Sequence, residues 1–190
     1  MPISKPVLQK YLPRMKPSIF IETGAHQGNT AETARQIGFS EVYTIELSDK
    51  WFTYCDQRFK DVDNVMVIHG DSSTKLEEIL GQINDPCVIW LDAHFSGGDT
   101  ALGDIPCPIY RELDILAAHP IKTHTILIDD MRAFGPSKKE CLFDVEELKD
   151  LTQEGVVERV KAINPDYKIS YEDGHHGKIV FKNDILVAQV

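Results

Sequence analysis

The chain has 190 residues, of which 42% are hydrophobic and 26% charged, a composition that excludes a disordered or fibrous protein. Its formal net charge is −10 and no cluster of lysine and arginine offsets it, which argues against nucleic-acid binding. Four irregularly spaced cysteines predict reduced thiols. Because no apolar run reaches the roughly 20 residues of a membrane span and no signal-peptide pattern is present, we expect one cytoplasmic domain over residues 1–190 and no membrane partner.

Short apolar runs alternate with helical patterns along most of the chain. Strands are expected at 18–22, 42–46, 65–69, 87–91 and 125–128, and helices at 7–15, 29–37, 49–59, from Ser72 or Ser73 (as the N-cap) through 80, and at 109–118. The first helix has two interpretations, a cap packed on the sheet or a lid over a ligand. Strands that alternate with helices predict a mostly parallel sheet covered on both faces.

The last third of the chain changes character. One or two helices are expected between 143 and 163, with an interruption at Gly155. An antiparallel hairpin of strands 167–171 and 178–181 follows, with a turn at 172–177 and a further short strand at 185–189. His175 and His176 fall in that turn, where a solvated turn is favoured over a metal site. The predicted fold class is therefore α/β, a Rossmann-like doubly wound sheet with a C-terminal antiparallel hairpin.

Acidic residues follow every predicted parallel strand: Glu22, Glu46, Asp71, Asp92 and the pair Asp129-Asp130. In an open α/β sheet, ligands bind outside the carboxyl ends of the strands, so these carboxylates should converge on one site. Taken singly, Glu22 could be a salt-bridge residue at a helix end and Asp71 a helix N-cap. Taken together with the glycine turn after the first strand, they favour a cofactor site.

That turn, Glu22-Thr23-Gly24-Ala25-His26-Gln27-Gly28-Asn29-Thr30, discriminates between cofactors. A dinucleotide fingerprint needs a third glycine where His26 stands, and a phosphate-binding loop needs a GK[ST] sequence that is absent here. The turn also contains no lysine or arginine that could bind a phosphate. An acid two residues before the first glycine suits a cofactor that carries a cation.

The motif E-T-G-A-H-x-G-N-T resembles the glycine motif of class I S-adenosylmethionine-dependent methyltransferases, and the resemblance covers residues 18 to 132. It implies the strand order 3-2-1-4-5-7-6. It also implies that Glu22 and the glycine turn hold the methionyl part of the cofactor, Glu46 the ribose and Asp71 the adenine amine. The implied cofactor-binding residues are Glu22, Thr23, Gly24, Ala25, His26, Gly28, Asn29, Thr30, Glu46, Leu47, Asp71, Ser72 and Asp92.

Asp92, Asp129 and Asp130 follow two strands that should be neighbours, and oxygen ligands of this kind select hard ions such as Mg²⁺. The arrangement is similar to that of the metal-dependent O-methyltransferases of the macrocin and catechol types. The resemblance implies Asp92, Asp129 and Asp130 as Mg²⁺ ligands and His94, beside Asp92, as the general base of the catalytic pair. The alternative is that Asp129 caps the next segment, Asp130 pairs with Arg132, and no metal binds.

The sequence therefore predicts S-adenosylmethionine-dependent, Mg²⁺-assisted O-methylation of a small hydroxylated molecule such as a sugar, in a minimal chain that a homo-oligomer would complete. Residues 96–104 form a long loop that either closes over this acceptor, bringing Asp99 or Thr100 near it, or lies on the surface. Three other functions stay open: a metal-dependent hydrolase or hydroxylase on the same fold, a cofactor-binding protein without catalysis, and a methyltransferase that acts on protein or nucleic acid. The net charge of −10 and the lack of an Asn-Pro-Pro-Tyr-type motif after the fourth strand argue against methylation of base amino groups.

Overall fold

A computed structural model describes residues 2–14, 16–95, 97–135 and 151–190. The elements alternate in type, and the helices are α1 (Lys5–Gln9), α2 (Asn29–Ile37), α3 (Asp49–Phe59), α4 (Ser72–Leu80), α5 (Ile109–Ala118), the 3₁₀ turn η1 (Met131–Ala133) and α6 (Gln153–Ile163). The strands are β1 (Ile19–Thr23), β2 (Glu41–Glu46), β3 (Val65–His69), β4 (Val88–Leu91), β5 (Thr125–Ile128), β6 (Lys168–His176) and β7 (Ile179–Gln189). Among the described residues, no helix combines the length and apolar character of a membrane span.

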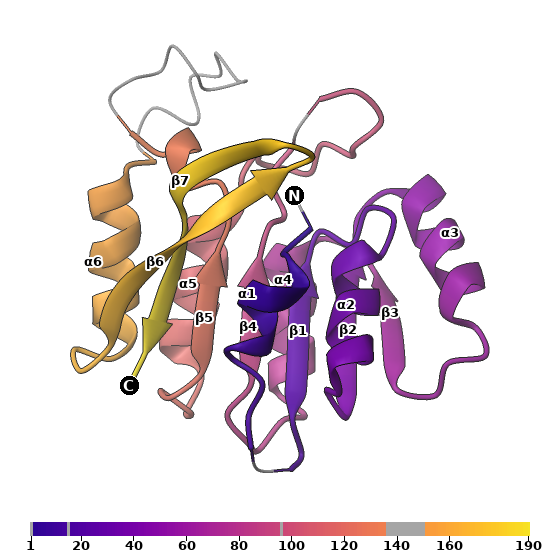
Figure 1. Cartoon of the computed structure of the whole chain (residues 1–190), viewed down its shortest axis with the longest axis horizontal. Helices are drawn as coiled ribbons and strands as arrows, with labels where there is room; N and C mark the ends of the chain where they lie inside the picture. The colour runs from indigo at the N-terminus through magenta and orange to yellow at the C-terminus, as the bar shows by residue number, and fades with distance from the viewer. Residues whose placement is uncertain (1, 15, 96, 136–150) are drawn as a thin grey trace.

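All seven strands belong to one sheet with the order β3-β2-β1-β4-β5-β7-β6, as predicted. Strands β1 to β5 are parallel, whereas β7 runs antiparallel to both β5 and β6. After β3 the chain crosses to the other half of the sheet, so the strand order reverses between the neighbours β1 and β4 (Figure 1). Their carboxyl ends form the topological switch point where a ligand is expected.

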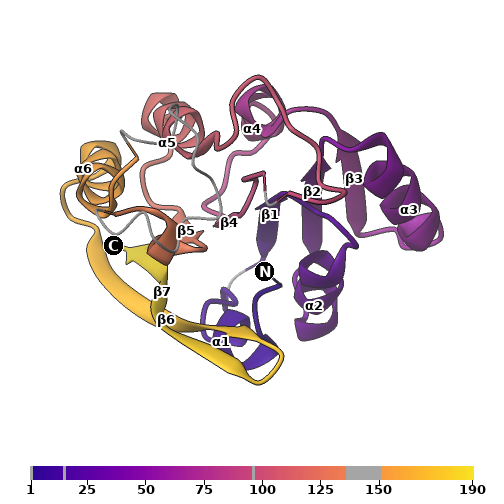
Figure 2. The same ribbon diagram turned by 90° about the horizontal axis from the view of Figure 1, so that it is seen from above.

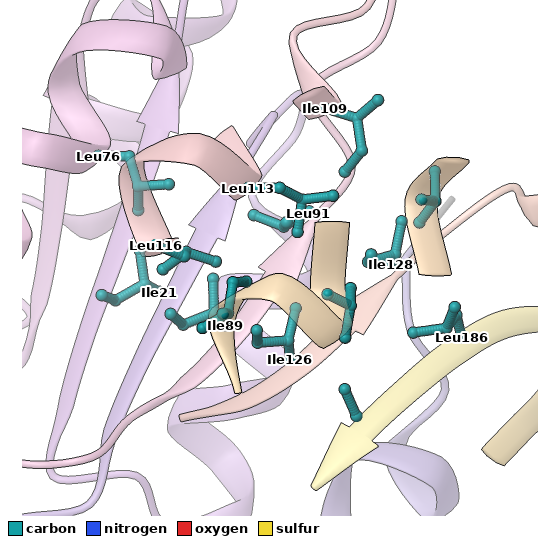
Figure 3. Close-up of a cluster of buried hydrophobic side chains, with 14 of the residues drawn as sticks. Ile21, Leu76, Ile89, Leu91, Ile109, Leu113, Leu116, Ile126, Ile128 and Leu186 are labelled. Atoms are coloured by element: carbon teal, nitrogen blue, oxygen red, sulfur yellow. The ribbon is translucent and has the colours of Figure 1, made fainter. Parts of the chain in front are cut away.

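Helices cover both faces of the sheet (Figure 2). One face packs on α4, α5 and α6 through a cluster that includes Leu76, Leu113 and Val156, and part of this cluster is drawn in Figure 3. The other face packs on α1, α2 and α3, where Leu8 and Ala31 are fully buried. This burial gives α1 a packing role on the sheet, and the helix is shorter than predicted. It ends at Gln9 because Pro13 lacks an N–H group and restricts Leu12.

Gly155 does not interrupt a helix, contrary to our prediction. Helix α6 runs through it from Gln153 to Ile163, and Thr152 caps the helix by accepting a 2.9 Å hydrogen bond from the Gly155 amide. A Cβ at Gly155 would overlap the hydroxyl oxygen of Tyr110, so glycine is needed here for close packing. The part of this prediction that concerns residues 143 to 150 lies outside the described residues.

The C-terminal hairpin is also more regular than predicted. The segments expected as a turn at 172–177 and as a separate strand at 185–189 belong to two long strands, β6 and β7, which meet at Gly177 and Lys178. The pairing has an irregularity between Glu172 and Gly174, where the sequence Glu-Asp-Gly had indicated a turn. His175 and His176 consequently lie in a strand and not in the turn.

A chain of buried imidazoles joins the amino-terminal ends of β4 and β5. The amide of Cys87 donates to Nδ1 of His124 over 3.1 Å, Nε2 of His124 lies 3.0 Å from Nδ1 of His119, and Nε2 of His119 lies 3.1 Å from the carbonyl oxygen of Leu80. If each ring carries a proton on Nε2 alone, every N–H in this series donates to the next group, so the series of hydrogen bonds is complete when both rings are neutral. Burial accordingly lowers the pKa of His124 to about 4.

Candidate functional site

The glycine turn after β1 brings two segments of backbone together. Gly24 has a φ of +83°, and its amide donates a 3.0 Å hydrogen bond to the carbonyl oxygen of Ile45 in β2. A Cβ on Gly24 would lie 2.6 Å from the carbonyl oxygen of Asp92. Gly28, with a φ of +71°, lets α2 begin against the ring of Phe59. Both glycines are thus required by backbone conformation and by close contact.

A cavity of about 490 Å³ opens where the carboxyl ends of β1 and β4 meet. Most of the predicted site residues line it: Glu22, Gly24, Ala25, His26, Asn29, Thr30, Glu46, Leu47, Asp71, Ser72, Asp92 and His94. Four predicted site residues do not line it: Thr23, Gly28, Asp129 and Asp130. The hydroxyl of Thr23 accepts a 3.2 Å hydrogen bond from the Asp92 amide and so ties β1 to the end of β4.

Glu22 is almost fully buried at the base of this cavity, with 1% of its surface exposed. Its carboxylate accepts a 2.7 Å hydrogen bond from the hydroxyl of Thr44 on β2. Burial raises the pKa of Glu22 to about 8, because desolvation outweighs the hydrogen bonds that favour the charged form. A cation bound in the cavity would reverse this shift.

Glu46 connects the glycine turn to the start of α3. One carboxylate oxygen accepts from the amide of His26 over 2.7 Å, and the other accepts from the amide of Ser48 over 2.8 Å. These two bonds fix the carboxylate plane at the edge of the cavity. Each oxygen keeps a second lone pair, so the group can still accept hydrogen bonds from a ligand.

Asp71 is the N-cap of α4, and its side chain accepts a 2.8 Å hydrogen bond from the amide of Ser73. The prediction that Ser72 or Ser73 caps this helix was therefore wrong, because the helix already begins at Ser72; the alternative that Asp71 is the N-cap is confirmed. Ser72 is buried and lines the cavity instead. A Cβ on Gly103 would lie 2.9 Å from a carboxylate oxygen of Asp71, so the loop after β4 lies directly over this residue.

That loop crosses the cavity toward α3. Asp99 forms an ion pair with Lys50, and its carbonyl oxygen accepts a 3.2 Å hydrogen bond from the indole of Trp51. Thr100 lines the cavity, whereas Asp99 is held against α3 outside the lining. The loop therefore covers the end of the cavity formed by Leu47 and Asp71.

His94 lies between two carboxylates at the other end. Its Nε2 is 3.0 Å from Oδ2 of Asp130, and its Nδ1 is 3.5 Å from Oδ1 of Asp92. Burial alone would lower the pKa of His94, but the hydrogen bond with Asp130 and the two negative charges raise it overall. Burial raises the pKa of Asp92.

Arg132 lies behind Asp130 and links it to the last strand. Nη1 of Arg132 is 2.5 Å from Oδ1 of Asp130, and the guanidinium also forms an ion pair with the buried Asp184 of β7. Burial alone would raise the pKa of Asp130, but His94 and Arg132 hold it below its usual range. Asp129 behaves differently, since burial and the nearby charge of Asp92 raise its pKa to about 8.

The predicted metal ligands fall into two groups within the described part of the chain. Ligand atoms of Asp92, His94 and Asp130 lie within 4.8 Å of one another, and so do those of Asp129, Asp130 and Asp184. Arg132 pairs with Asp184 and with Asp130, which belongs to both groups, and the pairing of Asp130 with Arg132 is the one that the metal-free alternative predicted. The first group, with two carboxylates and an imidazole, has donors that fit a divalent cation.

Several lining residues were not found from the sequence. They include Pro2, Trp51, Phe95, Ile105, Pro106 and the hairpin tip formed by His175, His176 and Gly177. The histidine pair was noted in the sequence, but nothing there indicated that the tip of the hairpin would reach the cavity. Glu112 was also missed; it is buried in α5 behind the cavity, and burial raises its pKa to about 7.

No protein-family model and no curated protein sequence matches this chain. Solved structures do match it in fold. The O-methyltransferase TomG from Streptomyces achromogenes, in complex with S-adenosylmethionine, is 13% identical with a TM-score of 0.63, and the match covers 99% of this chain and 81% of TomG. The S-adenosylhomocysteine-bound methyltransferase PaMTH1 from Podospora anserina is 13% identical with a TM-score of 0.56, covering 97% of this chain and 75% of PaMTH1.

A methylase of ribosomal RNA from Streptococcus thermophilus matches as well, with 12% identity, a TM-score of 0.57, and coverage of 97% of this chain and 92% of the methylase. Proteins with different acceptors thus share this architecture, and the fold alone does not select an acceptor. These matches agree in fold with what the structure itself shows: the strand order, the antiparallel β7 and a cavity at the switch point. The chain has the fold of the class I S-adenosylmethionine-dependent methyltransferases.

Proposed function

We propose that the protein transfers the methyl group of S-adenosylmethionine to a hydroxyl oxygen of a small hydroxylated molecule such as a sugar. The observation that carries the first half of this proposal is the cavity between β1 and β4. It gathers Glu22, Glu46 and Asp71 around a glycine turn, and its described lining residues include no lysine or arginine. Such a lining suits a sulfonium cofactor, because carboxylates attract its positive charge and the described lining offers no cationic side chain to a pyrophosphate.

Each acid has a distinct role toward this cofactor. Glu22 supplies negative charge at the base of the cavity, near the glycine turn that would hold the methionyl part. Glu46, oriented by the amides of His26 and Ser48, would accept the ribose hydroxyls. Asp71 would accept from the adenine amine, under the loop that includes Gly103.

His94 is the candidate base for the acceptor hydroxyl. Asp130 accepts from Nε2, which leaves the lone pair of a neutral imidazole on Nδ1, the nitrogen directed toward Asp92. Nδ1 would take the proton as the acceptor oxygen attacks the sulfonium methyl in line. Asp130 would stabilise the imidazolium that results, and most of the acceleration would come from alignment of oxygen and methyl group.

A divalent cation such as Mg²⁺ would be held by Asp92 and Asp130, with His94 beside them, and would lower the pKa of the bound hydroxyl. Asp129, the third predicted ligand, belongs to the neighbouring group around Arg132. Metal assistance is therefore a separate part of the proposal, with its own test.

Calorimetric titration with S-adenosylhomocysteine, with and without Mg²⁺, tests the cofactor. Absence of binding in both conditions would overturn the proposal, and a thermal shift with metal alone would instead favour a hydrolase or hydroxylase. Release of S-adenosylhomocysteine from S-adenosylmethionine in the presence of sugars and catechols tests the reaction. Binding without turnover on any acceptor would indicate a cofactor-binding protein. Turnover that is unchanged by chelation would overturn the metal-assisted part of the proposal.

A further inference from the structure

The β6–β7 hairpin extends beyond the sheet. Within the described parts of the chain, strand β5 pairs with β7 only at Leu186 to Ala188. Toward the turn, β6 and β7 pair only with each other among the described residues, with His175 opposite Val180 and His176 opposite Ile179. The hairpin therefore forms a two-stranded arm that passes α1 and ends near the N-terminus (Figure 1).

The arm is fixed at its base, although a two-stranded ribbon is only marginally stable alone. The carboxylate of Glu172 accepts hydrogen bonds of 2.7 and 2.8 Å from Lys10 and one of 2.8 Å from the hydroxyl of Tyr11. A Cβ on Gly174 would lie 2.7 Å from a carboxylate oxygen of Asp184, so the arm bends closely over its own partner strand. These contacts determine where the tip lies.

The tip forms one wall of the cavity. His175, His176 and Gly177 line it together with Pro2 and with His94 at the end of β4. The opposite end of the cavity is formed by Leu47 and Asp71 under the loop that is fastened to α3. Because that end would hold the adenosine, the tip bounds the part of the cavity left for the second substrate.

The charges in the cavity restrict what that substrate can be. Four carboxylates line it, those of Glu22, Glu46, Asp71 and Asp92, and the described lining contains no lysine or arginine. A phosphate or a coenzyme A thioester would lack a partner here, since proteins bind such groups with cationic side chains such as lysine and arginine. Two imidazoles can instead donate to and accept from hydroxyl groups.

We propose that His175 and His176 at the tip of the β6–β7 hairpin bind the methyl acceptor, and that the acceptor is a hydroxylated small molecule without a phosphate group. This inference rests on the proposed methyltransferase function. It adds two residues that would select the acceptor, contributed by a distant part of the chain, and it excludes phosphorylated substrates.

The test uses the full chain, labelled S-adenosylmethionine and matched probes: a sugar and its 6-phosphate, and a catechol and its phosphate ester. We expect methyl transfer only to unphosphorylated members. The variant His175→Ala/His176→Ala should raise the acceptor KM about tenfold and change the Kd of S-adenosylhomocysteine less than about twofold. The variant His175→Gln/His176→Asn should recover part of the loss, because amides keep hydrogen-bonding capacity.

Lys178→Ala is the matched control, since Lys178 lies in the same turn but does not line the cavity. It should leave both constants unchanged. An unchanged acceptor KM in the histidine variants, a preference for phosphorylated probes, or no transfer to any neutral probe by a protein that binds S-adenosylhomocysteine would overturn this inference. Failure to bind S-adenosylhomocysteine at all would overturn the proposed function itself.

Discussion

Oδ2 of Asp130 lies 3.0 Å from Nε2 of His94, and the other oxygen of the same carboxylate is paired with Arg132. Asp130 is thus the group that can orient His94 and keep its second nitrogen directed toward the cavity. The relationship makes Asp130 a sharper target for mutagenesis than the sequence motif alone indicated.

Asp130→Asn should lower kcat by about 100-fold and leave the Kd of S-adenosylhomocysteine within about twofold, because it removes orientation and charge from the base but no cofactor contact. Steady-state kinetics and calorimetry measure the two effects. Asp114→Asn is the control, since Asp114 is an exposed partner of Arg159. If excess Mg²⁺ restores the rate, Asp130 acts as a metal ligand; if the loss is the same at all Mg²⁺ concentrations, it acts as an orienting group.

Glu46→Gln should weaken binding of S-adenosylhomocysteine by about 10- to 100-fold, since the amide NH₂ would face a backbone amide that now donates to a carboxylate oxygen. Calorimetry of the purified variant measures this change. Glu41→Gln lies on the same strand, where Glu41 accepts only from the hydroxyl of Tyr43 among its described contacts, and should bind normally. Equal affinities for both variants would argue against a ribose-binding role for Glu46.

Gly24→Ala separates backbone strain from steric contact. Gly97 has a similar φ of +79°, but no heavy atom lies within 4 Å of the position that a Cβ would take there, so Gly97→Ala should cost only about 1 kcal/mol of unfolding free energy. Gly24→Ala should cost more, by about 1–3 kcal/mol, and should abolish cofactor binding, because its Cβ would displace the backbone at Asp92. Urea unfolding and calorimetry compare the two; similar stabilities would show that the contact relaxes freely.

The buried imidazole chain predicts sensitivity to acid. The pKa of His124 is lowered to about 4, below the ordinary value of about 6.5, so the unfolded chain binds a proton that the folded chain refuses. This stability is complete above pH 6.5 and declines toward pH 4. His124→Asn keeps an acceptor for the Cys87 amide but cannot be protonated.

We therefore expect the stability difference between the wild type and His124→Asn to shrink by about 2–3 kcal/mol between pH 7.5 and pH 4.5. Urea unfolding at both pH values measures it. A pH-independent difference would mean that His124 titrates normally.

Glu22 should make the opposite contribution to the pH dependence of stability. Its pKa is raised to about 8, so the folded chain without cofactor binds a proton that the unfolded chain releases near pH 4.5. The contribution of the protonated Glu22 is complete below pH 4.5 and is lost as the pH rises to 8. Glu22→Gln should therefore gain stability relative to the wild type between pH 5 and pH 8.5, as followed by thermal unfolding. If the stability difference between Glu22→Gln and the wild type does not change with pH, Glu22 has its ordinary pKa in the folded chain.

Periodicity was sufficient to predict the sheet, and the strand-ending acids were sufficient to predict that several carboxylates would share one cavity, since both depend on local patterns. Helix α3 and strand β5 have the predicted bounds, and Glu46 and Asp71 line the cavity. The hairpin was misread because Glu172-Asp173-Gly174 carries turn residues within a strand irregularity. The position of its tip depends on long-range contacts such as that of Glu172 with Lys10, which leave no local signal.

The contact between Gly24 and the backbone of Asp92 and Ala93 also has an evolutionary consequence. On the proposed function, it ties the glycine turn that would hold the methyl donor to the segment after β4 that would lead to the acceptor. Side chains beyond Ala93 and at the hairpin tip lie outside this contact. A lineage built on this scaffold could therefore exchange its proposed acceptor through substitutions there without disturbing the proposed methyl-donor site.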